Sequence, residues 1–512
     1  MDNRLDNLYQ YCSVGTAEAE QRLLQRVYVK GDEVQDLVVP PNGSPRLIVG
    51  RKGTGKSAVM RYAAQVLSTA GVPHLLMKPM DFEFPEGASE SSVGALARTA
   101  KSVILSSIAA ELGKNKSGLL AGEQLALYEQ AVKDGSVKRD FVGSLARFLP
   151  KIVKSLTKVE LDREFFDTAE TAGGLAQAIE ANAEGGQCPF YLYLDDVDQV
   201  ADFARPSHLN RVWSMLLAAR EIARSNSIRI VIALREEVWR RLLRDDAGQR
   251  DQADHFTPLV REMSPTRRHI AAVVRRRLVV ASAQAALPEI RDPYAHFFDG
   301  TGAPMPGSNE RRSWEDLIVL RARERPRDAI QMIGDLAQAA RTRNAEKITS
   351  EDLLRVMPEF SAQRVAMLAQ ELDPECPQIK EIVNSFAGVE YDQGSFKMTA
   401  DRCREHLRKV PSMFGVHLLG RVLKVNNDDD MVELWKYMYD LGILNARIAD
   451  NREKDGFRHI MPRDESGLVS RANWTRLQKM VWEINPAYRD YLLGRRDEEA
   501  RRTGLPPRKR AK

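Results

Sequence analysis

The chain has 512 residues, 43% of them hydrophobic and 29% charged, and its 76 Lys and Arg nearly balance 71 Asp and Glu. This composition is ordinary for globular domains, excludes a fibrous or low-complexity chain, and predicts about three domains at this length. We find no apolar run long enough to cross a bilayer and no signal-peptide core after Met1, so we expect a cytoplasmic protein without membrane contact. The four cysteines form no Cys-x-x-Cys pair, which indicates neither a zinc site nor a disulfide framework.

The strongest motif is a glycine-rich stretch that follows the apolar run Leu47-Ile48-Val49. Its spacing is G-x-x-x-x-G-K-[ST], in which backbone N–H groups wrap a phosphate chain at close range. We predict a helix that begins near Lys56, with Lys56 on the β- and γ-phosphates and the Ser57 hydroxyl on Mg²⁺. A plain glycine-rich turn is the alternative. The predicted nucleotide-binding residues are Gly50, Arg51, Lys52, Gly53, Thr54, Gly55, Lys56, Ser57 and Ala58.

Apolar periodicity predicts the elements on either side of this motif. We expect a helix over 16–29 ahead of it, a strand over 74–78 and a long helix over 89–112 after it. Residues 113–184 have helical periodicity but no motif, and we interpret them as a helical insertion in the core.

Three acids follow the apolar run 190–194. A continuous apolar run that ends in carboxylates is typical of a buried parallel strand that delivers acids to the phosphate edge of a sheet. Asp195 would hold Mg²⁺ through water, and Asp196 would orient or deprotonate the attacking water. The alternative is a strand that runs into an acidic turn, with Asp198 capping the next segment.

A second buried strand, over 228–234, ends at Arg235-Glu236-Glu237. The tip of a strand beside the acid-bearing strand would face the γ-phosphate. Arg235 would then sense that phosphate, and Glu236 would place water or Arg235. A charged surface turn that begins the helix 238–243 is an equal alternative.

Shorter elements complete this half of the chain. We predict a last strand over 257–260 and a helix from a Ser264 cap with Pro265 at its first position, followed by a loop-rich break over 287–311. Three helices follow, and the second places Arg327 on its first turn. Their predicted ranges are 314–322, 326–341 and 349–357.

This order of motifs resembles AAA+ and STAND-type ATPases, including the replication-initiator (origin-recognition) branch. It is still more similar to bacterial P-loop ATPases that carry the Gly50 to Ser57 phrase and a later Phe360-Ser361-x-x-Arg364. The resemblance implies an α/β P-loop core with a parallel sheet, a helical lid, and ATP with Mg²⁺ as cofactors.

The same resemblance implies two further arginines at the site. Arg327 becomes the candidate second sensor from the lid, and Arg250 the candidate arginine finger if protomers form rings or filaments. Two positions depart from the AAA+ pattern, because Asp196 stands where Glu is usual and Arg235 replaces a small polar residue. Both departures bear on hydrolysis more than on binding.

The pattern changes after residue 376. Helices over 377–386, 399–409 and 431–441, a strand over 395–398, and a hairpin around Asp450 predict a winged-helix domain that ends with a packing helix over 482–493. Its third helix follows three aspartates, which makes a poor surface for phosphates. The hairpin and a basic, disordered tail over 494–512 are better candidates for contact with double-stranded DNA, and a protein contact or a solubilising tail is the alternative. The basic hairpin residues are Arg447, Arg452, Lys454, Arg458 and His459.

We therefore expect an ATPase core over 1–264, a lid over 265–375, a winged-helix domain over 376–493 and a tail. The predicted function is an ATP-hydrolysing switch that assembles on DNA or a partner protein, as a homo-oligomer or with an effector. The resemblance suggests bacterial antiviral defence or DNA maintenance as the setting. The alternative is a nucleotide-dependent interaction scaffold that does not hydrolyse ATP; a small-molecule kinase is disfavoured because no acceptor-site motif is found.

Overall fold

The chain forms two compact units in the computed structural model. One unit is Lys30–Ser264, and the other joins Met1–Val29 to Pro265–Lys512. The predicted insertion at 113–184 lies almost wholly outside the described residues. Those residues are 4–17, 19–31, 34, 37, 40–78, 92–114, 176–177, 179–180, 189–200, 209–244, 250–306, 310–392, 394–453 and 456–503.

The unit Lys30–Ser264 is built on one five-stranded sheet with the order β2-β3-β4-β1-β5. Every pairing in it is parallel, and the three central strands β3, β4 and β1 are almost entirely buried, as a sheet with helices on both faces requires. The strands are β1 (Arg46–Gly50), β2 (His74–Met77), β3 (Phe190–Leu194), β4 (Ile228–Arg235) and β5 (Val260–Glu262). The predicted α/β fold with a parallel sheet is confirmed.

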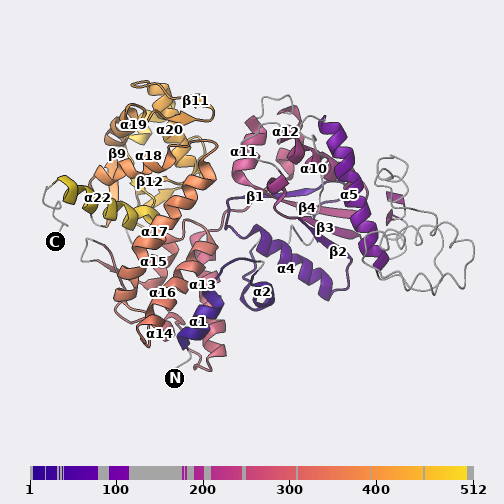
Figure 1. Cartoon of the computed structure of the whole chain (residues 1–512), viewed down its shortest axis with the longest axis horizontal. Helices are drawn as coiled ribbons and strands as arrows, with labels where there is room; N and C mark the ends of the chain where they lie inside the picture. Colours follow the sequence, from indigo (N-terminus) through magenta and orange to yellow (C-terminus); the bar gives the residue numbers. More distant parts are fainter. Residues whose placement is uncertain are drawn as a thin grey trace, which may run out of the picture. The chain divides into compact units, whose positions relative to one another are not determined.

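Helices cover the two faces of this sheet unequally. Figure 1 shows α4 (Lys56–Thr69) on one face, and α5 (Val93–Lys114) together with α10 (Leu209–Ile222) on the other. The apolar side chains of α5 and α10 pack together with Phe190 and Trp213 in the core of this unit. The remaining helical segments are η4 (Val197–Val200), α11 (Glu236–Arg244), α12 (Arg250–Phe256) and η6 (Thr257–Leu259).

The last strand begins later than predicted. Residues Thr257–Leu259 form the 3-10 turn η6 with Pro258 near its start, and β5 begins only at Val260. Proline suits the first positions of such a turn because its fixed φ is helical and its missing N–H is not needed there.

One described helix is long and apolar enough to span a membrane by length and composition. This stretch, Val93–Gly113 of α5, is 44% buried inside the unit. It packs against α10 in the core, so its apolar character has an explanation within the folded chain.

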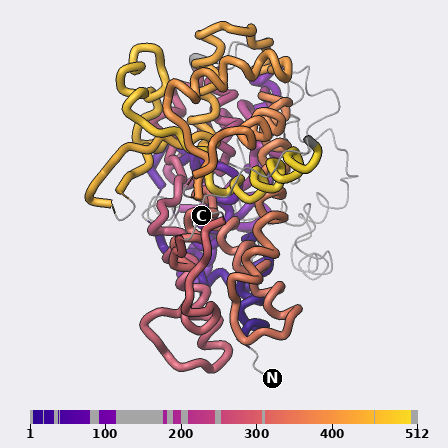
Figure 2. Tube along the Cα trace, turned by 90° about the vertical axis from the view of Figure 1, so that its left-hand side faces the viewer, coloured from indigo at the N-terminus to yellow at the C-terminus, as the bar shows by residue number. Residues whose placement is uncertain are grey.

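The second unit begins with a helical part that includes the N-terminus. Helix α1 (Arg4–Cys12) lies beside α16 (Pro326–Thr342), which Figure 2 shows as an indigo helix against an orange one. Leu5, Leu8 and Tyr11 join the same core as Ile333 and Leu336. Residues 1–29 therefore belong with the lid helices and not with the sheet, which differs from the predicted domain 1–264. The other elements are α2 (Gln21–Val27), α13 (Arg267–Gln284), α14 (Tyr294–Phe297), β6 (Ala303–Pro304), β7 (Arg311–Arg312), α15 (Trp314–Arg321) and α17 (Ser350–Leu372).

Two predicted helix ends are wrong. Helix α13 is capped by Thr266, whose hydroxyl accepts from the His269 N–H, and not by Ser264. Helix α17 does not stop before Pro358 but runs on to Leu372. Its buried stripe continues through Phe360 and Leu368, and this packing outweighs the hydrogen bond that proline removes.

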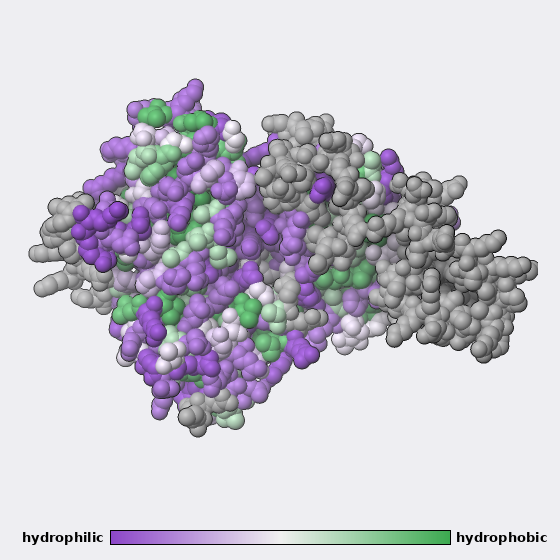
Figure 3. Space-filling view, in the orientation of Figure 1, coloured by the Kyte–Doolittle hydropathy of each residue, from purple (hydrophilic) through white to green (hydrophobic). Residues whose placement is uncertain are grey.

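The C-terminal part contains helix, strand, two helices and a hairpin in the predicted order. Its sheet has the order β13-β12-β14-β9-β8, and all its pairings are antiparallel. Hydrophilic residues dominate the face of this unit that Figure 3 shows. The elements are α18 (Ile379–Ser385), η7 (Phe386–Gly388), β8 (Tyr391–Asp392), β9 (Ser395–Thr399), α19 (Ala400–Phe414), β10 (His417–Leu418), β11 (Arg421–Val422), α20 (Asp428–Asp440), β12 (Leu444–Ala449), β13 (Phe457–Ile460), η8 (Arg471–Asn473), α21 (Trp474–Leu477), β14 (Val481–Ile484), η9 (Pro486–Tyr488) and α22 (Arg489–Thr503).

The predicted packing helix over 482–493 is wrong. Its first residues form β14, which lies between β12 and β9, and Trp482 is fully buried there. The helix α22 starts only at Arg489 and continues to Thr503, into the segment predicted as a disordered tail. The strand β14 is only four residues long and three of them in a row are buried, so periodicity alone does not distinguish it from a buried helix segment.

Candidate nucleotide site

Three strand ends meet at one edge of the parallel sheet. Gly50 at the end of β1 is in register with Arg235 at the end of β4. Strand β3 pairs with the other side of β4 and is followed directly by Asp195. The predicted loop, the arginine and the acids therefore lie at the same edge, and β4 stands between the loop strand and the acid strand.

Glycine is required by space at the start of the loop and by backbone conformation within it. A Cβ on Gly50 would lie 2.7 Å from the Met263 carbonyl oxygen and 2.9 Å from Thr54 Oγ1. Gly53 and Gly55 have φ of 85° and 106°, which side chains other than glycine rarely adopt. Thr54 closes the turn, since its hydroxyl donates to the Arg51 carbonyl at 2.9 Å.

Helix α4 begins at Lys56, as predicted, with Gly55 as its N-cap. The Lys56 ammonium is buried inside the loop and donates to the carbonyls of Gly50 and Arg51 at 2.6 and 3.1 Å. Burial lowers the pKa of Lys56, and the charge of Asp198 opposes that shift. A buried ammonium at a helix N-terminus provides positive charge where an anion would be held.

The two predicted magnesium ligands touch each other. The Ser57 hydroxyl on the first turn of α4 donates to Asp195 Oδ1 at 3.1 Å. Asp195 is 1% exposed, and its Oδ1 also accepts from the Asp196 N–H at 3.0 Å. This brings together a hydroxyl and a carboxylate from distant parts of the chain, which are oxygen ligands of the kind that Mg²⁺ takes.

Asp196 sits in a different environment from its neighbour. Its backbone is left-handed, with φ of 52°, and its carbonyl accepts from the Gln199 N–H at 2.8 Å. The side chain is partly exposed, whereas that of Asp195 is buried. The sharp turn after β3 thus separates a buried acid from a more accessible one.

Sequence reasoning missed the role of Asp198. The 3-10 turn η4 brings this third acid back under the site, where it is 1% exposed and its Oδ2 lies 2.8 Å from Arg235 Nε. Burial raises the pKa of Asp198 to about 6, although the Arg235 charge acts in the opposite direction. The sequence did contain a signal for this pair. Asp198 stands three residues after Asp195, and Arg235 stands at the tip of the next predicted strand.

Glu236 has a partner other than the predicted one. Its carboxylate lies 3.1 Å from Arg51 Nε and 3.7 Å from Arg240 Nε. Asp198, and not Glu236, is therefore the acid that holds Arg235. Glu236 instead connects the first turn of α11 to the phosphate-binding loop.

The remaining predicted site residues are placed as follows. Lys52 lies in the loop, and Ala58 follows Ser57 on α4. Arg250 is the first residue of α12, and its side chain is outside the described part of the structure. Arg327 belongs to the other unit, near the start of α16 and beside Gly15, so its role at a nucleotide stays a prediction.

Comparison with known proteins gives one family model and several solved structures. The FunZ-associated C-terminal helical domain matches residues 273–369, which span most of α13 through α17. No curated protein matches the chain.

Solved structures of two other proteins are similar to this chain. The chain is similar to the Aeropyrum pernix ORC2 protein in its ADPNP-ADP complexes, with 12% identity, coverage of 96% of this chain and 95% of that one, and a TM-score of 0.40. It is also similar to Cdc6p from Pyrobaculum aerophilum, with 14% identity, coverage of 91% and 95%, and a TM-score of 0.32. With TM-scores this low, the fold assignment depends on the strand order and the loop geometry of this chain.

Proposed function

We propose that this protein binds ATP with Mg²⁺ and hydrolyses it as a molecular switch. The observation that carries the proposal is the contact between Ser57 Oγ and Asp195 Oδ1, 3.1 Å apart beside the buried ammonium of Lys56. A hydroxyl on the first turn after a glycine-rich loop and an acid after a neighbouring buried strand are the parts that P-loop ATPases use.

The residues present fit a magnesium triphosphate. The N-terminus of α4, the Lys56 ammonium and the glycine-lined backbone supply positive charge and N–H donors for phosphate oxygens. Ser57 and Asp195 would hold Mg²⁺, which neutralises charge on the phosphates when it is bound. The loop itself requires Gly50, because a Cβ there would clash with Met263 and Thr54.

For hydrolysis, Asp196 is the residue that we assign to the attacking water. It is more exposed than Asp195 and lies one residue further from the strand end. Arg235 is the candidate contact to the γ-phosphate, since its strand tip is in register with Gly50. Its ion pair with Asp198 sets the orientation from which it would act.

A second function is favoured by a specific observation. Asp196 is one methylene shorter than the glutamate usual in AAA+ enzymes, and Arg235 is already engaged by Asp198. Both features favour slow turnover, so the alternative is a scaffold that binds ATP and a partner protein without hydrolysis.

We extend the proposal to assembly on double-stranded DNA or a partner protein, in a setting of DNA maintenance or antiviral defence. The exposed arginines of the β12–β13 hairpin, Arg452 and Arg458, support contact with DNA. The start of α20 is acidic and favours a protein contact instead. Arg250 and Arg327 would reach the nucleotide from a second protomer and from the lid.

One experiment first measures ATP affinity and then separates these functions by two readouts, phosphate release and particle size with ATP and duplex DNA. Lys56→Ala should reduce ATP affinity at least about tenfold, equivalent to ~1.4 kcal/mol, because it removes the buried ammonium. Asp196→Asn should retain ATP binding, lose phosphate release and keep the larger particle that ATP produces.

The matched control is Lys101→Ala, which removes an exposed cation of α5 paired with Glu221. It should behave as the wild type in both readouts. Absence of phosphate release from the wild type, with ATP binding intact, would establish the scaffold and overturn the switch.

A further inference from the structure

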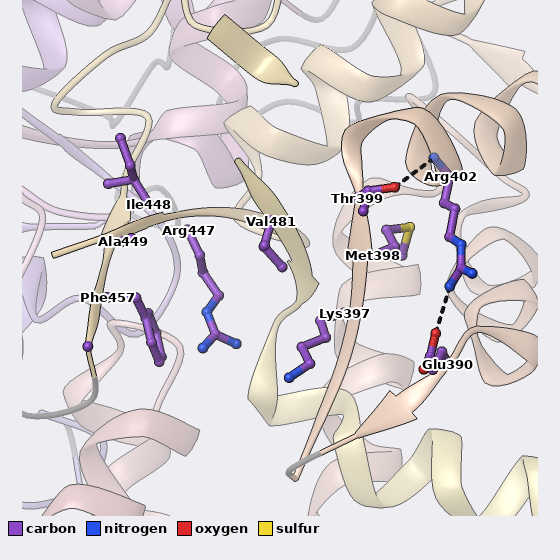
Figure 4. A pocket seen from close by; sticks show the side chains of 11 residues that line it. Glu390, Lys397, Met398, Thr399, Arg402, Arg447, Ile448, Ala449, Phe457 and Val481 are labelled. Atoms are coloured by element: carbon purple, nitrogen blue, oxygen red, sulfur yellow. Dashed lines mark hydrogen bonds and ion pairs between the residues drawn. The ribbon is translucent and has the colours of Figure 1, made fainter. Parts of the chain in front are cut away.

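A second site lies in the C-terminal domain and does not depend on nucleotide binding at the loop. The face of the sheet formed by β9, β14, β12 and β13 holds a cavity of about 360 Å³. This size lies in the range of about 300–1,000 Å³ typical of small-molecule sites. Figure 4 shows the side chains that surround it. The residues used below are Lys397, Arg402, Arg447, Ala449, Phe457 and Val481.

One wall of the cavity is a flat cationic stack. The guanidinium of Arg447 lies 3.3 Å from the centroid of the Phe457 ring on the neighbouring strand. Figure 4 shows the two side chains side by side, with Arg447 pointing toward the cavity between Phe457 and Lys397. Guanidinium planes and aromatic rings are the groups on which nucleic-acid bases stack.

A buried acid forms an ion pair with the arginine of this stack. Glu483 lies 3.4 Å from Arg447 and accepts a hydrogen bond from His459 at 3.0 Å. Burial raises the pKa of Glu483, but the His459 hydrogen bond and the Arg447 charge outweigh it and lower the pKa to about 2. Glu483 therefore stays ionised and fixes the guanidinium before any ligand arrives.

The opposite wall carries two cations, of which Arg402 is exposed and Lys397 is half-buried. Lys397 of β9 pairs with Asp392 at 2.9 Å, and Arg402 of α19 pairs with Glu390 at 2.6 Å. The Arg402 pair is exposed to solvent and the Lys397 pair is partly exposed, and ion pairs that water reaches contribute little. A phosphate group carries more charge and more acceptor oxygens than either carboxylate, so it would replace them.

We propose that this cavity binds a nucleotide unit, with its base on the Arg447–Phe457 stack and its phosphate between Lys397 and Arg402. Ala449 and Val481 supply the apolar floor that a base edge would cover. An acidic peptide would satisfy the cations but would leave the flat stack uncovered. The nucleotide can be free or part of a single strand, and the chemistry of recognition is the same.

The test uses the full chain with Lys56→Ala in every protein compared, so that binding at the loop is weakened and is the same in all of them. Two probes are titrated by calorimetry. One is AMP, and the other is an unlabelled single strand of 12 deoxythymidine nucleotides. The double variant Lys397→Ala/Arg402→Ala should weaken binding about tenfold, and Phe457→Leu should weaken it by a similar factor because it removes the ring against which the Arg447 guanidinium is stacked. A double variant with the same change in charge, Lys409→Ala/Arg471→Ala, is the control, because both cations are exposed and outside the cavity.

Pocket-dependent binding of AMP supports the proposal with a free nucleotide as ligand. Pocket-dependent binding of the strand alone supports it with a nucleotide in single-stranded nucleic acid. Equal losses in the pocket and control variants would show a general charge effect and overturn the proposal. Binding of neither probe would overturn it as well.

Discussion

At the scale of single residues, the arrangement of the candidate site depends on which side chain each acid contacts. Arg235 is held by Asp198, Arg51 by Glu236, and Asp195 by Ser57. Three residues that follow one another closely, Asp195, Asp196 and Asp198, thus have separate environments. The sequence could predict the acids but not their distribution, because one left-handed residue and one 3-10 turn decide it.

The raised pKa of Asp198 makes a prediction about pH. The folded chain holds this proton up to about pH 6, whereas the ordinary value is 3.8. Between these values the folded state binds more protons than the unfolded state, so the contribution to stability falls as pH rises from about 4 to about 6. Asp198→Asn removes the titration, so the wild type should lose up to ~3 kcal/mol relative to this variant over the window.

Urea unfolding of both proteins at several pH values between 4 and 7 measures this difference. Asp254→Asn, a change at an exposed acid of α12, is the control and should not reproduce the pattern. A difference between Asp198→Asn and wild type that is constant across this range would contradict the assigned environment of Asp198.

At the scale of elements, the N-terminal helix depends on one close contact. A Cβ on Gly334 of α16 would overlap the Cys12 carbonyl oxygen and lie 3.0 Å from the Cys12 carbonyl carbon. Gly334→Ala should therefore lower the free energy of unfolding of this unit by ~1–3 kcal/mol through overpacking, although alanine is the better helix former.

Gly494→Ala in α22 is the matched control for that change. Nothing lies within 4 Å of its added Cβ, so it should raise stability by ~0.5–1 kcal/mol through helix propensity alone. Thermal unfolding of the two variants provides the comparison. A stabilised Gly334→Ala protein would contradict the packing of α1 on α16.

At the scale of the whole molecule, apolar runs and periodicity predicted the parallel sheet and most helices, and a motif predicted the loop. Long-range packing decided what it missed. Residues 1–29 joined the lid because Leu5, Leu8 and Tyr11 find their core there, and α17 passed Pro358 because its buried stripe continues. Val481–Ile484 is a strand because it pairs with β12 and β9, and the local sequence does not show this pairing.

The same limit applies to the candidate site. The loop residues and Asp195 were predicted because each follows directly from a motif or from the end of an apolar run. Asp198 was missed because its function depends on a partner on another strand, which a single sequence does not show. Arg250 and Arg327 were proposed from resemblance, and their roles stay predictions.

The most direct test of the central claim is the magnesium dependence of binding of a non-hydrolysable ATP analogue, measured by calorimetry on wild type, Ser57→Ala and Asp195→Asn. If Ser57 and Asp195 hold the cation, Mg²⁺ should increase wild-type affinity at least about tenfold, ~1.4 kcal/mol, and neither variant should show the increase. Wild-type protein that ignores the analogue, or variants that keep the full magnesium effect, would contradict the account.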